Sequence, residues 1–419
     1  MTIHMEASPS KSPLDAQTTV PYFRPSITEE EIENVVSCLR SGWLTSGPRV
    51  QQFEESFSEA VQAKHAIAVN SCTAALHLAV EALGLQPGQA VLVPTVTFAS
   101  TAEIIRYQGA IPILVDCDPI SLNMDLTDAE NKLQQLKQGS LPLDEPLQPV
   151  GIIPVHVGGA MMDMTAVKAF AKRNNLWVVE DAAHAFPAAM RSDPSSPWIQ
   201  CGQDTASVTC FSFYTNKTIT TGEGGMAVTN DPQLADHIRQ MSLHGLSNDA
   251  WKRYSGTGSW DYRIIAPGYK YNLTDIAASI GIVQLRRSEE LRLKRENIAK
   301  FYNDHFAEVA EIELPASPEN RLHSWHLYPI KLRLDKLSIS RNEFIDQLRN
   351  EKVGYSVHWR PLHLHTYYQE NFGWTANDLP VATAQWERLI SLPLFPGITS
   401  AELNHVVNTV RKLCTKFAS

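Results

Sequence analysis

The sequence predicts an α/β protein in which a large domain with a mostly parallel sheet precedes a smaller C-terminal α+β domain. A chain of 419 residues, 43% of them hydrophobic, exceeds the roughly 250–300 residues at which single cores stop growing. Short β-branched runs alternate with helical runs over about 200 residues, which is typical of parallel sheets covered by helices. A hinge is expected near Gly268–Asp275. We therefore predict a large domain over residues 21–275 and a small one over residues 276–419.

The N-terminal part is expected to contain an arm and two helices. Residues 1–20 are rich in Ser, Thr, Pro and charge, which favours a disordered or extended arm. Thr28 can cap a helix whose apolar residues recur at helical spacing and that ends near Ser41-Gly42. After a loop, a second amphipathic helix should end at about Val61.

Short apolar runs are expected to form the strands of the large sheet. These runs are Ala66–Val69, Ala90–Val93, Ile111–Val115, Gly151–Val157, Trp177–Val179, Ala206–Phe211 and Met226–Val228. In such sheets, ligands bind beyond the carboxyl ends of the strands. After the hinge, Ile276–Lys300 is predicted as one long helix, and the small domain should include Leu327–Leu332, Tyr355–His358 and a last helix from Ser400.

Charge and hydropathy exclude several classes of protein. The 36 basic and 45 acidic residues give a net charge of −9 without a long basic run, so we expect no binding of nucleic acid. No apolar run approaches the roughly 20 residues that span a bilayer, and the N-terminus is polar. We therefore predict no membrane segment and a cytoplasmic location.

Cysteine and histidine do not form a recognisable metal pattern. The six cysteines are scattered without CxxC pairs, which fits reduced thiols better than disulfides or a zinc site. His323 with His326, or His363 with His365, could be drawn as ligand pairs. No matching carboxylate or cysteine pattern accompanies them, so we predict no metal site.

The segment Phe211–Gly225 places Lys217 between a strand and a glycine-rich turn. Such a lysine can form a Schiff base with a carbonyl cofactor if its surroundings lower its pKa from about 10.4. A surface lysine beside a turn would explain the same pattern. Taken alone, the segment leaves both interpretations open.

Trp177–Ala185 is a predicted strand that ends in a carboxylate. A pyridoxal ring acts as an electron sink while its nitrogen is protonated, and Asp181 at the strand end can hold that proton. Asp181 lies 36 residues before Lys217, which allows a βαβ-sized excursion to bring both to one edge of the sheet. Asp181 could also simply cap the next helix.

Ala68–Leu78 is a predicted strand that turns into a helix through small hydroxylated residues. The free amides of that helix, with the hydroxyls of Ser71 or Thr73, would bind a phosphate. An ordinary capped helix is the alternative. Ser212 could add a hydroxyl beside the lysine, and Phe98 could stack on an aromatic cofactor or be a core phenylalanine.

Phosphate cradle, stacking aromatic, acid and lysine occur in the order that a pyridoxal-phosphate site of the aspartate-aminotransferase fold (fold type I) requires. With these segments the sequence resembles the DegT/StrS family of sugar aminotransferases from about Pro21 to the C-terminus. Further matching motifs are Arg24-Pro25, Gly42–Pro48, Val115–Asp118, Pro154–His156, Gly268–Asp275, Pro361–His363 and Ser391–Gly397.

The resemblance implies a role for each residue of the candidate site. Lys217 would anchor pyridoxal 5′-phosphate, Asp181 would contact its pyridine nitrogen, and His184 would lie near its phenolic oxygen. The resemblance also places Phe98 over the ring. The residues implied around the phosphate are Ser71, Cys72, Thr73 and Ser212.

The resemblance further implies a homodimer whose active sites borrow residues from the partner chain. The stretch Gly268–Asp275 is similar to the donated loop, which contacts the phosphate. Many family members carry Asn where Lys270 stands and Arg where Asn272 stands. The variant in this chain resembles the subgroup that makes UDP-4-amino-4-deoxy-L-arabinose, which favours amination at carbon 4. Cys72 and the run Gly158–Met161 are further departures from the family pattern.

The predicted reaction transfers an amino group from an amino acid, expected to be glutamate, to a keto-sugar linked to a nucleoside diphosphate. Lys217 would serve as both anchor and base. Thr45, Tyr328 and His358 are candidate sugar contacts, and Arg360 is a candidate phosphate or carboxylate contact. These four positions could equally be structural.

Competing functions make different demands on the sequence. A sugar 3-dehydratase of the same family has histidine in place of the lysine, so Lys217 argues against it. A non-catalytic pyridoxal-phosphate-binding regulator could keep the fold, although intact Lys217 and Asp181 make this less favoured. A P-loop hydrolase is excluded because the chain has no GxxxxGK[ST] pattern.

Overall fold

The main body of the molecule is a seven-stranded sheet covered by helices. The structure, a computed structural model, describes residues 19–143, 147–246 and 263–419. The strands of this sheet are β1 (His65–Val69), β2 (Gln89–Pro94), β3 (Ile111–Val115), β4 (Gln148–Ile152), β5 (Trp177–Asp181), β8 (Val208–Ser212) and β9 (Gly225–Thr229). Their order is β1-β9-β8-β5-β4-β2-β3.

The sheet is mostly parallel, as predicted. β8, β5, β4, β2 and β3 pair in parallel, whereas β9 lies antiparallel between β8 and β1. Because β1 is antiparallel to β9, it runs in the same direction as β8. The carboxyl ends of β1, β2, β5 and β8 therefore meet at one edge of the sheet, where a ligand site is expected.

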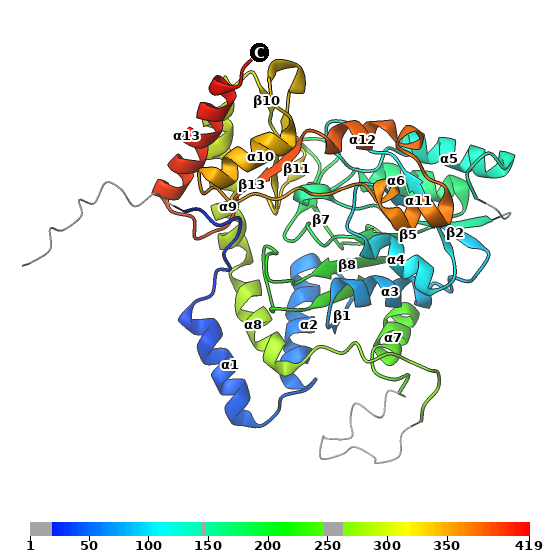
Figure 1. Cartoon of the computed structure of the whole chain (residues 1–419). Helices are drawn as coiled ribbons and strands as arrows, with labels where there is room; N and C mark the ends of the chain where they lie inside the picture. The colour runs from blue at the N-terminus through cyan, green and yellow to red at the C-terminus, as the bar shows by residue number, and fades with distance from the viewer. Residues whose placement is uncertain (1–18, 144–146, 247–262) are drawn as a thin grey trace, which may run out of the picture.

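Helices from both halves of the chain cover this sheet. They are α2 (Pro48–Val61), α3 (Cys72–Ala82), α4 (Ser100–Tyr107), α5 (Leu126–Gln138), α6 (Met164–Asn174) and α7 (Pro232–Met241). The buried side chains of strands and helices form one large hydrophobic cluster. α11 (Thr366–Phe372), late in the sequence, adds Tyr368 and Phe372 to it and lies beside α4 in Figure 1.

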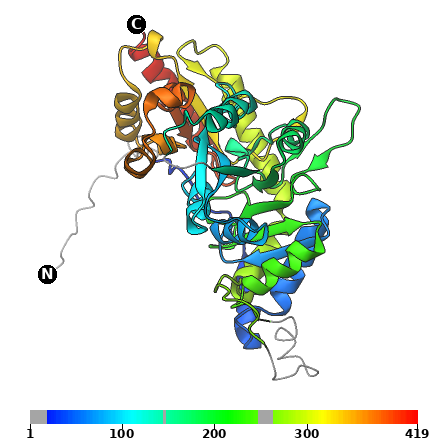
Figure 2. The same ribbon diagram turned by 90° about the vertical axis from the view of Figure 1, so that its right-hand side faces the viewer.

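The C-terminal part forms a second core. β10 (Ile312–Glu313), β12 (Tyr328–Leu332) and β13 (Leu389–Leu392) make an antiparallel sheet. α9 (Ser288–Phe306), α10 (Arg341–Asn350) and α13 (Ser400–Lys416) pack around it, and their apolar residues form a second cluster. Figures 1 and 2 show these C-terminal elements together at one end of the molecule.

The remaining elements connect the two parts. α1 (Glu29–Ser41) packs against α8 (Asp275–Arg286), and α12 (Pro380–Trp386) precedes β13. A small sheet joins β11 (Arg321–Leu322), β6 (Ala189–Met190) and β7 (Ile199–Gln200). The predicted N-terminal helices are confirmed, since α1 has Thr28 and Gly42 at its ends and α2 ends at Val61.

The prediction of one long helix over Ile276–Lys300 is wrong. The helix breaks at Arg287, and α9 begins at Ser288, followed by the acidic residues Glu289 and Glu290, which favour a helix start. The Arg287 guanidinium binds Glu31 at 2.6 Å. The apolar residues of α8 belong to the large-sheet cluster, and the predicted domain boundary at residue 275 stays a prediction.

Two further predictions need correction. The strand expected over Gly151–Val157 begins earlier and ends at Ile152; Pro154, which has no backbone N–H, lies in an irregular segment beyond it. Of the predicted arm, residues 1–18 lie outside the described residues. Val20, expected in that arm, is buried, and its amide donates to the Lys352 carbonyl at 3.0 Å.

No helix among residues 19–143, 147–246 and 263–419 is long and apolar enough to cross a membrane. The cytoplasmic location stays a prediction.

Candidate active site

A cavity of about 470 Å³ opens at the edge where the carboxyl ends of the strands meet. Segments distant in sequence line it, from the start of α3 through the loop before β9 to His358 and Trp359 in the C-terminal part. The lining residues that the sequence singled out are Ser71, Cys72, Thr73, Phe98, Asp181, His184, Ser212, Lys217 and His358. The structure thus brings the predicted lysine, acid, histidine, aromatic and phosphate-binding residues to one place.

Lys217 lies in the turn between β8 and β9, where its amide donates to the Tyr214 carbonyl at 2.9 Å. The side chain is partly buried in the cavity. Burial lowers the pKa of Lys217 from 10.5 to about 8, although the nearby Cys72 and Asp181 act in the opposite direction. A lysine with such a pKa has a far larger neutral, nucleophilic fraction near pH 7 than an ordinary lysine has.

Asp181 is the last residue of β5, and its carboxylate is held from two sides. Oδ2 accepts a hydrogen bond from Thr101 Oγ1 at 2.7 Å, and Oδ1 accepts from the Ala183 amide at 3.1 Å. Burial raises the pKa of Asp181, and these two bonds and Lys217 oppose the rise. An opposite charge brought into the cavity would therefore be stabilised beside this carboxylate.

The N-terminus of α3 provides donors for an anion. Ser71 is the N-cap, and its Oγ accepts from the Ala74 amide at 3.0 Å. The amides of Cys72 and Thr73, the first two of the helix, have no acceptor within the helix. β9 begins directly against this turn: a Cβ on Gly225 would lie 2.4 Å from the Ser71 carbonyl carbon and 2.6 Å from the Cys72 nitrogen. A glycine is therefore required for the close approach.

Phe98 is not a core residue. Its side chain is 61% exposed at the cavity, so its ring is available for stacking. Ser212 also lines the cavity, and its Oγ accepts from the Tyr214 amide at 3.4 Å.

His184 is enclosed by other rings. Trp359 stacks on it with ring centroids 5.0 Å apart and an interplanar angle of 18°, and His326 lies 4.1 Å away. His184 Nδ1 accepts a hydrogen bond from the Gly158 amide at 3.3 Å. Burial lowers the pKa of His184 well below its usual value, with Lys217 adding to the effect. The neutral ring therefore has Nε2 as its donor.

Four predicted contacts are not among the residues that line this cavity. Tyr328 is fully buried in β12, where its hydroxyl donates to Asn303 at 2.6 Å. Arg360 lies over the Trp386 ring at 5.4 Å. The Thr45 carbonyl accepts from the Asp275 amide at 3.1 Å, and exposed Lys270 binds Asn272. Within one chain, none of these four reaches the cavity.

Sequence reasoning missed several residues at the site. Thr101, which binds Asp181, lies three residues after Phe98 on α4, and a strand-end pattern gives no sign of it. His326 had been considered only as a metal ligand paired with His323. The two do not converge: His326 lines this cavity, whereas His323 lines another one and stacks on Trp325. Trp359 follows His358 directly but was not recognised.

The other histidine pair also separates. His363 binds Thr95 at 2.8 Å and Thr383 at 2.9 Å, whereas Nε2 of His365 donates to the Arg360 carbonyl at 3.2 Å. The six cysteines are free and buried. The absence of a metal site stays a prediction.

The residues of the cavity fit pyridoxal phosphate. α3 offers amides for a phosphate, Lys217 an amine for a carbonyl, and Asp181 a carboxylate for a protonated ring nitrogen. Two buried atoms at the cavity, Asn216 Oδ1 and His326 Nδ1, have no hydrogen-bond partner within the described part of the chain. Such atoms are usually satisfied when a ligand is present.

A partly buried lysine that shares a cavity with a carboxylate at the strand ends of a mostly parallel sheet is the arrangement of an aspartate-aminotransferase-like protein. The chain belongs to the DegT/DnrJ/EryC1/StrS aminotransferase family, whose model matches residues 25–411. It is 41% identical over 395 residues to the spore coat polysaccharide biosynthesis protein SpsC of Bacillus subtilis, covering 94% of this chain and 97% of that protein.

Solved structures show the same fold. The PLP form of the Streptococcus pneumoniae protein Spr1654 superimposes with a TM-score of 0.82 at 31% identity, covering 95% of this chain and 99% of that one. The sugar aminotransferase CalS13 of Micromonospora echinospora gives 0.79 at 28% identity, covering 94% and 99%. The predicted family, fold class and enzyme class are confirmed, and the predicted cofactor agrees with these structures.

Proposed function

We propose that the protein transfers an amino group from an amino acid to a keto-sugar linked to a nucleoside diphosphate, with pyridoxal phosphate as cofactor. The observation that carries this proposal is the burial of Lys217, with a pKa of about 8, in one cavity with Asp181 and the start of α3. When bound, the cofactor supplies an electron sink for the carbon that loses its proton. The same lysine argues against the dehydratase and regulator alternatives.

In this proposal Lys217 has two tasks. Its amine would hold the cofactor, and once free it would act as the base that moves the proton of the donor's Cα. A group whose pKa lies near neutrality can both accept and return a proton. The partly buried position of Lys217 also keeps its amine away from bulk water.

The acidic and aromatic residues hold the cofactor in place. Asp181 would hold the proton on the ring nitrogen through a charge-assisted hydrogen bond, with its carboxylate fixed by Thr101. His184 would donate from Nε2 toward the phenolic oxygen, and Phe98 would cover the ring. The amides of Cys72 and Thr73, with the hydroxyls of Ser71, Thr73 and Ser212, would bind the phosphate.

For the substrates, the donor is expected to be glutamate and the acceptor carbon to be carbon 4. The expectation of carbon 4 rests on the loop Gly268–Asp275, which with Lys270 resembles the loop of the subgroup that aminates this carbon. His358, which lines the cavity, remains the candidate sugar contact.

We also infer a homodimer that completes its sites across the interface. An apolar stripe on α1 supports this: Ile32 and Leu39, seven residues apart on one helix face, are 47% and 51% exposed. Lys270 and Thr45 do not reach the cavity of their own chain, and we propose that the partner subunit's Lys270 and the partner subunit's Thr45 do.

Absorbance spectra test the reaction. Wild type loaded with pyridoxal phosphate should show a visible band that glutamate converts to the spectrum of the amine form. Lys217→Ala should not show this conversion, whereas Lys64→Ala, which removes an exposed lysine, should. The amine form is then offered 3-keto and 4-keto sugars linked to nucleoside diphosphates. Only the 4-keto sugar should restore the visible band; a response to the 3-keto sugar alone would overturn the position, and a band insensitive to every amino acid would overturn the reaction.

Mixing inactive subunits tests the shared site. Lys217→Ala and Lys270→Ala homodimers are unfolded, mixed and refolded together. In the mixed dimer, one site keeps both Lys217 and the partner subunit's Lys270, so activity should return well above that of either parent. If the mixture stays as inactive as its parents while wild type refolds normally, the sites are not shared through Lys270.

A further inference from the structure

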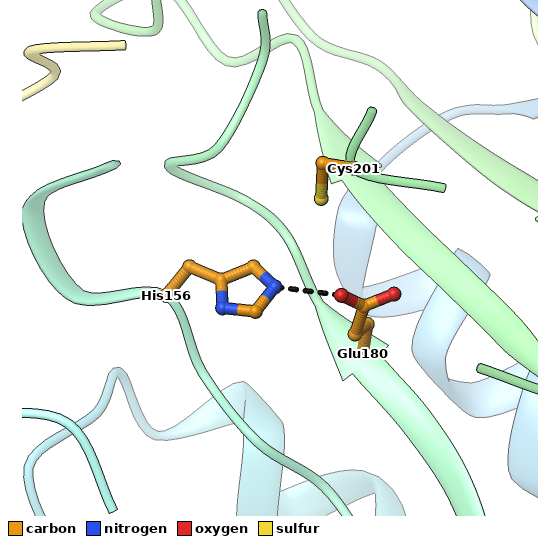
Figure 3. Close-up of side chains that lie close together, drawn as sticks. All are labelled: His156, Glu180 and Cys201. Atoms are coloured by element: carbon orange, nitrogen blue, oxygen red, sulfur yellow. Dashed lines mark hydrogen bonds and ion pairs between the residues drawn. The ribbon is translucent and has the colours of Figure 1, made fainter. Parts of the chain in front are cut away.

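A buried polar network lies behind the cavity, on the side of β5 away from Asp181. His156 and Glu180 are both fully buried, and Nε2 of His156 lies 2.8 Å from Oε1 of Glu180 (Figure 3). Thr205 and Thr209 donate to the second carboxylate oxygen, the latter at 2.7 Å. Cys201 lies close by, and its ligand atom and those of His156 and Glu180 all lie within 4.8 Å of one another.

The group has the residue types of a metal site but the geometry of a hydrogen-bond network. Metal ligands must be deprotonated, yet burial raises the pKa of Cys201 well above its usual value. Burial would also raise the pKa of Glu180, but the hydrogen bond and electrostatic interaction with His156, together with hydrogen bonds from Thr205 and Thr209, outweigh it and the pKa is lowered. Glu180 is therefore a carboxylate whose oxygens already have donors.

His156 connects two segments through its two ring nitrogens. Nε2 lies against Glu180 on β5, and Nδ1 accepts a hydrogen bond from the Met162 amide at 3.2 Å. A ring that accepts at Nδ1 carries its proton on Nε2. His156 thus donates to Glu180 through Nε2 and accepts from the Met162 amide at Nδ1, so one ring joins β5 to the end of the segment Val157–Met162.

This turn contacts the candidate active site directly. The Asp181 amide donates to the Pro154 carbonyl at 2.9 Å, and the His156 amide donates to the Asp181 carbonyl at 3.3 Å. Two residues further on, Gly158 has a positive φ of 71° and its amide donates to His184 Nδ1. Asp181 and His184, which both line the cavity, are thus attached to the segment that His156 holds.

We propose that His156 is a positioning residue: it shapes the turn Val157–Met162 so that the Gly158 amide fixes the proton of His184 on Nε2. His184 then accepts from the Gly158 amide at Nδ1 and donates from Nε2. The consequence for the reaction rests on the proposed function, in which His184 donates to the cofactor's phenolic oxygen. The structural claim does not depend on it.

The first test uses the full-length wild-type protein without cofactor, labelled with ¹⁵N in its histidine rings. Two-bond ¹H–¹⁵N spectra distinguish the tautomers, and the His156→Gln and His184→Gln variants assign the signals. Both His156 and His184 should carry a proton on Nε2 and none on Nδ1, as their backbone donors at Nδ1 require. A His156 ring protonated on Nδ1, or on both nitrogens, would overturn the proposal without any variant.

Two substitutions then separate the two contacts of the ring. His156→Gln can still donate to Glu180 but lacks the acceptor for the Met162 amide, whereas His156→Asn keeps an acceptor near Nδ1 and loses Glu180. The glutamine variant should show His184 as a mixture of tautomers and exchange the Gly158 amide at least about tenfold faster, a factor equivalent to 1.4 kcal/mol. The asparagine variant should keep the wild-type tautomer of His184.

Leu413→Ala serves as a control for general loosening, because Leu413 is buried in the separate C-terminal cluster. It should leave the His184 tautomer unchanged. An unchanged tautomer in His156→Gln would refute the positioning role. The positioning role would also be refuted if the wild-type protein bound one zinc ion per chain and His156→Gln bound none, because Nε2 would then be a metal ligand. If the wild-type tautomers are as expected but the protein loaded with pyridoxal phosphate shows no visible band, the proposed function is refuted and the positioning role of His156 still holds.

Discussion

Replacing Lys217 with methionine should make the cofactor-free protein more stable at neutral pH. Burial holds the pKa of Lys217 at about 8, against 10.5 in the unfolded chain. Between these values the unfolded chain binds more protons than the folded protein, so wild-type stability rises with pH across this window. Below pH 8 the full cost of the buried charge is present. Methionine has a similar length and carries no charge, so it removes that cost.

The two pKa values set the size of the effect. They correspond to about 3 kcal/mol at pH 7 and about 1.4 kcal/mol at pH 9.5. Urea unfolding of the cofactor-free wild type and Lys217→Met at both pH values measures the difference. Lys64→Met, at an exposed position, should show no comparable gain. A Lys217→Met gain that is absent at pH 7, or equal at the two pH values, would refute the assignment of a desolvated lysine.

Three further substitutions test the other parts of the site. Asp181→Asn should bind the cofactor but slow amino transfer about 10- to 150-fold, the equivalent of losing a hydrogen bond to a charged group. Single-turnover rates measure the effect, and an unchanged rate would show that Asp181 does not contact the ring nitrogen. Gly225→Ala should weaken cofactor and inorganic phosphate binding about tenfold, because its Cβ would collide with the Ser71–Cys72 turn. Gly397→Ala, with open space around its Cβ, should bind both normally. Calorimetry measures the affinities, and an affinity of Gly225→Ala equal to that of wild type would contradict phosphate binding at the start of α3. Phe98→Ala should weaken cofactor binding about three- to tenfold by loss of stacking, measured by fluorescence titration; tighter or unchanged binding would count against stacking.

The parts of the site that the sequence predicted share one physical feature. Ser71, Phe98, Asp181 and Ser212 each lie at or just after the carboxyl end of a strand, and a mostly parallel sheet brings such ends together. Recognising the strands was therefore enough to bring these residues to one edge. The resemblance supplied what spacing alone could not, the identity of the group that binds there.

The residues that were missed come from segments whose position depends on tertiary packing. Trp359 and His326 belong to the C-terminal part and reach the cavity only because that part folds back against the large sheet. Thr101 requires the side-chain direction of α4, and His156 requires the irregular path after β4. Local patterns contain neither kind of information. The break at Arg287 had a local signal, Ser288 followed by two acidic residues, that an uninterrupted apolar pattern outweighed.

The most direct test of the central claim is to identify the lysine that holds the cofactor. The protein loaded with pyridoxal phosphate is reduced with borohydride, digested and analysed by mass spectrometry. The account predicts that the peptide containing Lys217 gains the mass of the reduced cofactor and that Lys217→Ala shows no such peptide. A modification found on another lysine, such as Lys270, or no modification in protein that shows the visible band, would contradict the account.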